Sequence, residues 1–307
     1  MQFFLINGLT WANWLFQTYQ NSRSSVYLDI RNWSVINPAG RYLGVQIFQI
    51  RQTASIQSLQ RKQRRTISVY WKSWRSYVET CMSDVETCDC QDFVKLVEFF
   101  NISSKYGWNY VCFNSGCIDK SSSAELEESI CSMFNWYCNS KICIVHLATT
   151  GDIRTLQQDP WFRRGWTLQE LLAPKRIKFF GRSWQHITLS SIDNDKDANL
   201  NILLWEIISD ITQIPCCRLL NFTSGIKHAR DVFVWVSKRK TTQVEDIAYC
   251  LIGLLAIPLL IAYGEGNMAF HRLQVEILQH SHDLGLFVWT GQPSTYNSML
   301  AEGPQCF

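Results

Sequence analysis

Residues 161–174 read Trp161-Phe162-Arg163-Arg164-Gly165-Trp166-Thr167-Leu168-Gln169-Glu170-Leu171-Leu172-Ala173-Pro174. Gly165 interrupts the chain and Pro174 cannot continue a helix, so the residues between them predict one short, bounded helix. Its leucines form an apolar stripe, and Glu170 is its one acid. A carboxylate held on a short helix against an apolar face is a candidate catalytic group, although a lone glutamate on a helix is more often a solvated surface residue.

Helical and strand-like segments alternate around this stretch. Tyr110–Phe113 is a continuous apolar run, and residues 142–147 and 176–180 look like two further buried strands. Ser122 and Glu125 form a capping box that predicts the start of a helix whose apolar face reaches Tyr137. Strands separated by helices indicate the α/β class, with a parallel sheet flanked by helices.

The pattern becomes mainly helical beyond residue 185. Helical periodicity marks residues 200–211, 229–237, 244–255 and 268–280. We therefore predict four regions: an atypical basic N-terminal segment of unknown fold, an α/β domain, a helical C-terminal region and a tail. Their predicted boundaries are 1–80, 81–185, 186–290 and 291–307.

Composition sets limits on function. The chain has 307 residues, of which 47% are apolar and only 18% charged, which predicts a globular protein with some apolar surface available for association. Residues 1–80 hold ten Lys/Arg against two Asp/Glu, whereas the remainder is net acidic. The basic run at 61–65 could be a nucleic-acid patch, but a solvated charge run is favoured, and without any zinc-finger, RNP or helix-turn-helix pattern we expect no nucleic-acid partner.

The sequence also predicts the compartment and the absence of a metal. The twelve cysteines form no paired C-x-x-C clusters, so we expect reduced thiols and no metal site. Residues 1–15 lack a basic n-region, and the apolar run 248–264 is shorter than a membrane span needs. We therefore expect a cytoplasmic protein with no membrane span, and this apolar run in the core.

Three ordered blocks resemble the HET (heterokaryon incompatibility) domain of fungal proteins. Residues 117–137, beginning Cys117-Ile118-Asp119, are similar to the middle signature of that domain, and 164–171 are similar to its closing R-x-W-T-L-Q-E-L. Residues 244–249 and 262–266 resemble the region that follows the domain in many members. The resemblance covers roughly residues 84 to 290.

This resemblance implies a fold and a chemistry. HET domains resemble TIR domains, so the implied sheet is TIR-like or flavodoxin-like, and the spacing from Trp166 to Glu170 matches the W-C-x-x-E-L helix of TIR domains. In catalytic TIR domains that glutamate serves NAD hydrolysis. Carried over, Glu170 is the catalytic acid, and Trp166, Asp119, Ser115 and Asn114 contact the substrate. NAD is then a substrate, and no cofactor or metal is implied.

The chain also departs from the family pattern. No S-H-T-W-G strand occurs in the first 80 residues, so the sheet could lack its first strand, and Asn114 stands where the family commonly has an acid. Two interpretations remain. The chain is either a signalling protein of fungal nonself recognition and programmed cell death, whose assembly triggers NAD hydrolysis or another toxic output, or a non-catalytic module with a degenerate site. The second would act by self-association or through protein partners.

Overall fold

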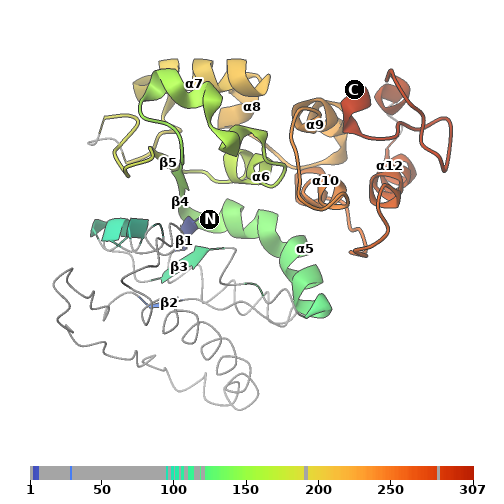
Figure 1. The fold of residues 1–307 in the computed structure, drawn as a ribbon, viewed down its shortest axis with the longest axis horizontal. Helices are drawn as coiled ribbons and strands as arrows, with labels where there is room; N and C mark the ends of the chain where they lie inside the picture. The colour runs from blue at the N-terminus through green and yellow to red at the C-terminus, as the bar shows by residue number, and fades with distance from the viewer. Residues whose placement is uncertain are drawn as a thin grey trace, which may run out of the picture. The chain divides into compact units, whose positions relative to one another are not determined.

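The chain divides into two compact units, Met1–Glu125 and Leu126–Phe307 (Figure 1). The computed structural model describes residues 3–6, 28–29, 95, 98–99, 101–103, 105–106, 110–113, 118, 122–189, 193–281 and 284–307. The domain boundaries drawn from composition remain a prediction. The basic run at residues 61–65 lies outside the described residues.

Three short strands are described in the first unit. They are β1 (Phe3–Ile6), β2 (Leu28–Asp29) and β3 (Tyr110–Phe113). β3 is the predicted strand, but β1 and β2 both pair with it in antiparallel orientation. The expectation of parallel pairing is therefore wrong for these two neighbours of β3. Sequence reasoning assigned no structure to the first 80 residues and so missed β1 and β2.

Helix α5 (Ser123–Asn139) follows the predicted pattern. The hydroxyl of Ser122 accepts a hydrogen bond from the backbone N–H of Glu125 at 3.4 Å, which satisfies one of the free donors at the helix start. The expected apolar face is buried at Ile130, Phe134 and Tyr137. The predicted start and face of this helix are confirmed.

The second unit contains a parallel pair of strands. β4 (Ser140–His146) pairs with β5 (Ile177–Phe180), with Cys143 opposite Ile177 and His146 opposite Phe180. Between them the chain forms two 3-10 helices, η2 (Ile153–Gln158) and η3 (Pro160–Arg163), and then α6 (Thr167–Leu172). The described fold is thus mixed and helix-rich, with a small two-strand parallel sheet flanked by helices.

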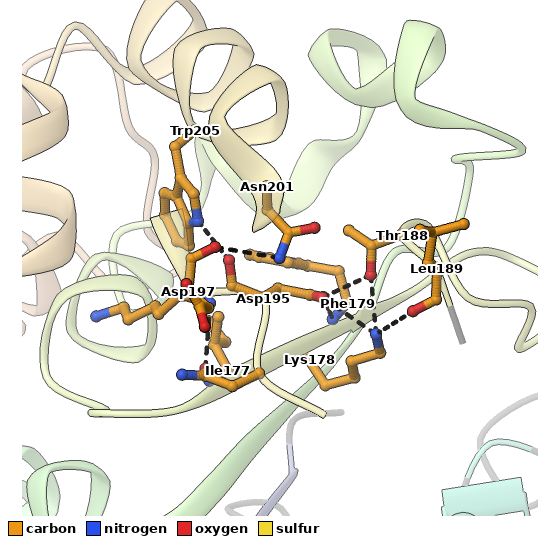
Figure 2. Close-up of polar contacts among 11 residues, drawn as sticks. Ile177, Lys178, Phe179, Thr188, Leu189, Asp195, Asp197, Asn201 and Trp205 are labelled. Atoms are coloured by element: carbon orange, nitrogen blue, oxygen red, sulfur yellow. Dashed lines mark hydrogen bonds and ion pairs between the residues drawn. The ribbon is translucent and has the colours of Figure 1, made fainter. Parts of the chain in front are cut away.

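A buried lysine closes the loop after β5. Lys178 Nζ lies 3.1 Å from Asp195 Oδ1 and 2.8 Å from Thr188 Oγ1, and it also donates to the carbonyl of Leu189 (Figure 2). The other carboxylate oxygen of Asp195 accepts from the backbone N–H of Phe179 at 2.8 Å. A fully buried charge pair is tolerated only with such hydrogen bonds, so this network is structural.

The rest of the second unit is helical, as predicted. Its longer helices are α7 (Ala198–Thr212), α9 (Ala229–Val236) and α12 (Met268–His280). The shorter ones are α8 (Cys216–Leu220), η4 (Ile226–His228), η5 (Leu284–Phe287) and η6 (Pro304–Cys306). The predicted tail also packs here, because the ring of Phe307 lies 5.0 Å from that of Phe233 on α9.

The single helix predicted for residues 244–255 is wrong. The chain forms α10 (Asp246–Tyr249) and α11 (Ile252–Leu255), separated at Cys250 and Leu251. The backbone N–H of Leu251 bonds three residues back to Ala248 instead of four, which tightens the turn and ends α10. Residues 248–255 belong to the core as predicted, apart from the partly exposed Gly253. The prediction is wrong for the rest of the run, 256–264, where only Ile257 and Leu259 are buried and Leu260 is 65% exposed.

Candidate functional site

The segment before α6 is fixed by Asp159. Its Oδ1 accepts from the backbone N–H of Trp161 at 3.0 Å and caps η3. Its Oδ2 accepts from the hydroxyls of Thr149 and Thr150, both at 3.0 Å. The two threonines that follow β4 therefore hold η3 in place through their hydroxyls.

Gly165 marks a close approach between two distant segments. The N–H of Lys240 donates to the carbonyl of Arg163 at 2.6 Å, and the N–H of Gly165 donates to the carbonyl of Lys240 at 2.9 Å. A Cβ at Gly165 would lie 2.5 Å from Cγ2 of Thr241, closer than side-chain atoms approach. Packing therefore requires this glycine, which the sequence predicted only as a break.

Glu170 is enclosed by two hydrogen-bond donors. The phenol of Tyr137 on α5 donates to Oε1 at 3.1 Å, and the indole N–H of Trp161 on η3 donates to Oε2 at 3.2 Å. Only 1% of Glu170 is exposed, so solvent does not reach the carboxyl group. Glu170 thus ties α6 to two other elements.

Burial decides the charge of this group. It raises the pKa of the Glu170 carboxyl to about 8, against the hydrogen bond from Tyr137, the charge of Arg164 and the hydrogen bond from Trp161. The carboxyl is therefore mostly protonated at neutral pH. Cleavage of a nicotinamide-ribose bond develops positive charge on the ribose, which a negatively charged carboxylate would stabilise. In the described conformation the carboxyl of Glu170 carries little of that negative charge.

A second layer of contacts supports the same turn. The hydroxyl of Thr167 donates to the carbonyl of Trp161 at 2.6 Å and accepts from Nη1 of Arg239 at 2.9 Å. That Nη1 also donates to the carbonyl of Arg164 at 3.0 Å. Burial lowers the pKa of Arg239 to about 10, which still leaves it charged, and its Nη2 has no hydrogen-bond partner among the described residues.

Lys196 caps the other end of α6. Its Nζ donates to the carbonyl of Leu172 at 3.2 Å and to that of Pro174 at 2.7 Å. These carbonyls lie at and beyond the C-terminus of the helix, where a cation is favoured. Burial lowers the pKa of Lys196 to about 8. Both ends of the helix that carries Glu170 are therefore held by buried groups from elsewhere in the chain.

The structure describes two of the five predicted site residues. Glu170 is buried, and Trp166 is half-buried immediately before α6. Asn114, Ser115 and Asp119 lie outside the described residues, so their approach to Glu170 stays a prediction. The indole that contacts the carboxyl is that of Trp161. Trp161 lies in the same stretch of sequence, but the sequence pattern carries no signal that its indole N–H donates to Glu170.

A cavity lies elsewhere in the second unit. It has a volume of about 620 Å³ and is formed by α5, α11 and the segment after α11. Phe134 and Ile257 give it apolar walls, and Glu127 and Cys131 give it polar ones. Glu170 does not line it. Among the described residues, no group of His, Cys, Asp and Glu could hold a metal ion, and no helix is long and apolar enough to cross a membrane.

Over part of its length the chain is homologous to a fungal vegetative incompatibility protein. That relative is vegetative incompatibility protein HET-E-1 of Podospora anserina, to which the chain is 37% identical over 185 residues. The alignment covers 56% of this chain and 12% of HET-E-1. No family model and no solved structure matches the chain. This similarity agrees with the resemblance of the sequence motifs to the heterokaryon incompatibility domain.

Proposed function

We propose that the chain is a signalling protein of the vegetative-incompatibility type, acting in the fungal cytoplasm in nonself recognition and programmed cell death. The observation that carries this proposal is the 37% identity to HET-E-1. It is supported by the closing motif, whose Glu170 turn is held by contacts from α5, η3 and the segment after α9. The alignment covers only 12% of HET-E-1, so the proposal does not assign the activity of the whole HET-E-1 protein to this chain.

Association with protein partners is the output that the geometry favours. Both oxygens of Glu170 accept hydrogen bonds and the group is buried, which suits a structural acid better than a catalytic one. The N-terminal part of α7 exposes Leu200, Ile202 and Leu203, each by 58% or more. Exposed apolar side chains gathered on one element are a common feature of contact surfaces.

The proposal is tested by inducible expression of the full chain in a filamentous fungus. We expect induced cells to lose viability relative to uninduced cells, because assembly of a death-signalling protein rises with its concentration. A strain that accumulates the folded protein and grows like the uninduced control would contradict the proposal.

NAD hydrolysis is the second candidate. It is favoured by the raised pKa of Glu170, since a perturbed carboxyl is common at catalytic sites, and by the TIR-like spacing from Trp166 to Glu170. It requires a conformation in which the carboxyl is released from Tyr137 and Trp161. Purified full chain incubated with NAD would then release nicotinamide, and Glu170→Gln would abolish that release. No release at any protein concentration would remove this candidate.

A further inference from the structure

Five basic residues gather where η3 meets the segment between α9 and α10. Two of them, Arg163 and Arg164, come from the end of η3, and the other three form the run Lys238-Arg239-Lys240. Arg164 and Lys240 form a parallel β-bridge, so these two positions lie side by side. The adjacency is enforced by backbone hydrogen bonds of 2.6 and 2.9 Å and by the absence of a side chain at Gly165.

These charges are not neutralised within the described part of the chain. Arg163, Arg164, Lys238 and Lys240 are exposed, and none of the described ion pairs includes any of them. Like charges at neighbouring positions repel each other, so the fold tolerates a local electrostatic cost here. The cost falls when an anion binds between them.

The buried Arg239 adds to the positive potential from below. Its Nη1 donates to the backbone carbonyl of Arg164 at 3.0 Å, which places the guanidinium close to the backbone of one of the exposed residues. Only 6% of Arg239 is exposed, and its Nη2 has no hydrogen-bond partner among the described residues. A buried charge close to a binding surface is screened less by water than an exposed one.

We propose that this basic cluster is a binding site for a pyrophosphate group, free or carried by a nucleotide. Guanidinium groups hold phosphate oxygens with paired hydrogen bonds, and lysine ammonium groups neutralise the remaining charge. Two linked phosphates carry more negative charge than one, which suits the adjacent Arg164 and Lys240 together with the exposed Arg163 and Lys238 of the same two segments. The site is independent of the proposed signalling function and of Glu170.

Calorimetric titration of the full chain tests this site, with pyrophosphate, ADP, AMP and adenosine as the probes. We expect pyrophosphate and ADP to bind, AMP to bind more weakly, and adenosine not to bind. Arg164→Gln combined with Lys240→Gln should weaken pyrophosphate binding on the order of tenfold or more. Added salt should weaken binding to the wild-type chain.

The matched control is Arg154→Gln combined with Lys227→Gln, which removes the same charge from exposed positions outside the cluster. It should bind pyrophosphate like the wild type. Circular dichroism verifies folding, and Arg163→Gln with Lys238→Gln replaces the first pair if that pair does not fold. The proposal is overturned if pyrophosphate does not bind, if the cluster and control variants bind equally, or if a single-stranded oligonucleotide binds while pyrophosphate does not.

Discussion

Glu170 lies with its carboxyl between the phenol of Tyr137 and the indole of Trp161. Its folded-state pKa of about 8 lies above the ordinary value of 4.5, so the fold favours the neutral form. The stabilising contribution of such a group is fully present below the unfolded pKa and is lost as the pH rises through the folded pKa. The wild-type chain should therefore lose stability between about pH 5 and 8.

Glu170→Gln removes this pH dependence, because an amide cannot ionise and can donate to Tyr137 while accepting from Trp161. The wild type should lose about 1.4 kcal/mol per pH unit from this group, up to a few kcal/mol by pH 8, and the variant should not. Lys196 changes the free energy of unfolding little over this pH range, because its pKa is lowered only to about 8. Urea unfolding of the wild type and the variant at about pH 5 and about pH 8 measures the change in the free energy of unfolding. The same change in both chains would disprove the prediction.

Between elements, single atoms decide how closely two segments can pack. Gly165 lies against Thr241, and the hydroxyl of Thr167 links η3, α6 and Arg239. Thr241 and Arg239 are both far in sequence from the residues that they contact, and Thr167 and Arg239 are 72 positions apart. The rigidity of the turn that carries Glu170 therefore comes from long-range contacts, in addition to the glycine and the proline that bound it.

Gly165→Ala should destabilise the chain by about 1–3 kcal/mol, because the new methyl group overlaps Cγ2 of Thr241. Thr241→Ser removes that Cγ2 and should recover part of the loss. Chemical unfolding of both single variants and the double variant measures the coupling between the two sites. Additive effects would show that the two residues do not meet as described.

Thr167→Val should cost about 1–3 kcal/mol, because the buried guanidinium of Arg239 loses an acceptor while the side-chain volume is nearly kept. Thr167→Ser is the matched control, since it retains the hydroxyl and removes one methyl group. Thermal unfolding compares the two variants. A loss of stability in Thr167→Ser with none in Thr167→Val would mean that packing of the methyl group, and not the hydrogen bond, holds this position.

Sequence periodicity predicted the elements that are amphipathic or continuously apolar. α5, β4, β5 and α12 were placed because their buried residues repeat at helical spacing or form unbroken apolar runs. The break between α10 and α11 was missed, because a tightened turn leaves the apolar pattern unchanged. Tyr137 was predicted as a core residue, and the sequence alone could not show that its hydroxyl meets a carboxyl 33 residues away.

At the scale of the whole molecule, we predict self-association, protein partners and a cytoplasmic location. These predictions need measurements on the whole chain. The low charged fraction and the exposed residues Leu200, Ile202 and Leu203 favour association. Light scattering on the purified full chain should show an average mass that rises with concentration. A monomer mass of 35.7 kDa throughout the micromolar range would argue against self-association.

The central claim is that the chain signals incompatibility without Glu170 acting as a catalyst. Viability of fungal cells after induction of the Glu170→Gln chain, compared with the wild-type chain at equal protein level, tests it most directly. Glutamine preserves the hydrogen bonds to Tyr137 and Trp161 but cannot carry the charge of a catalytic carboxylate. We predict equal loss of viability with both chains. Death with the wild type and normal growth with Glu170→Gln would contradict the account.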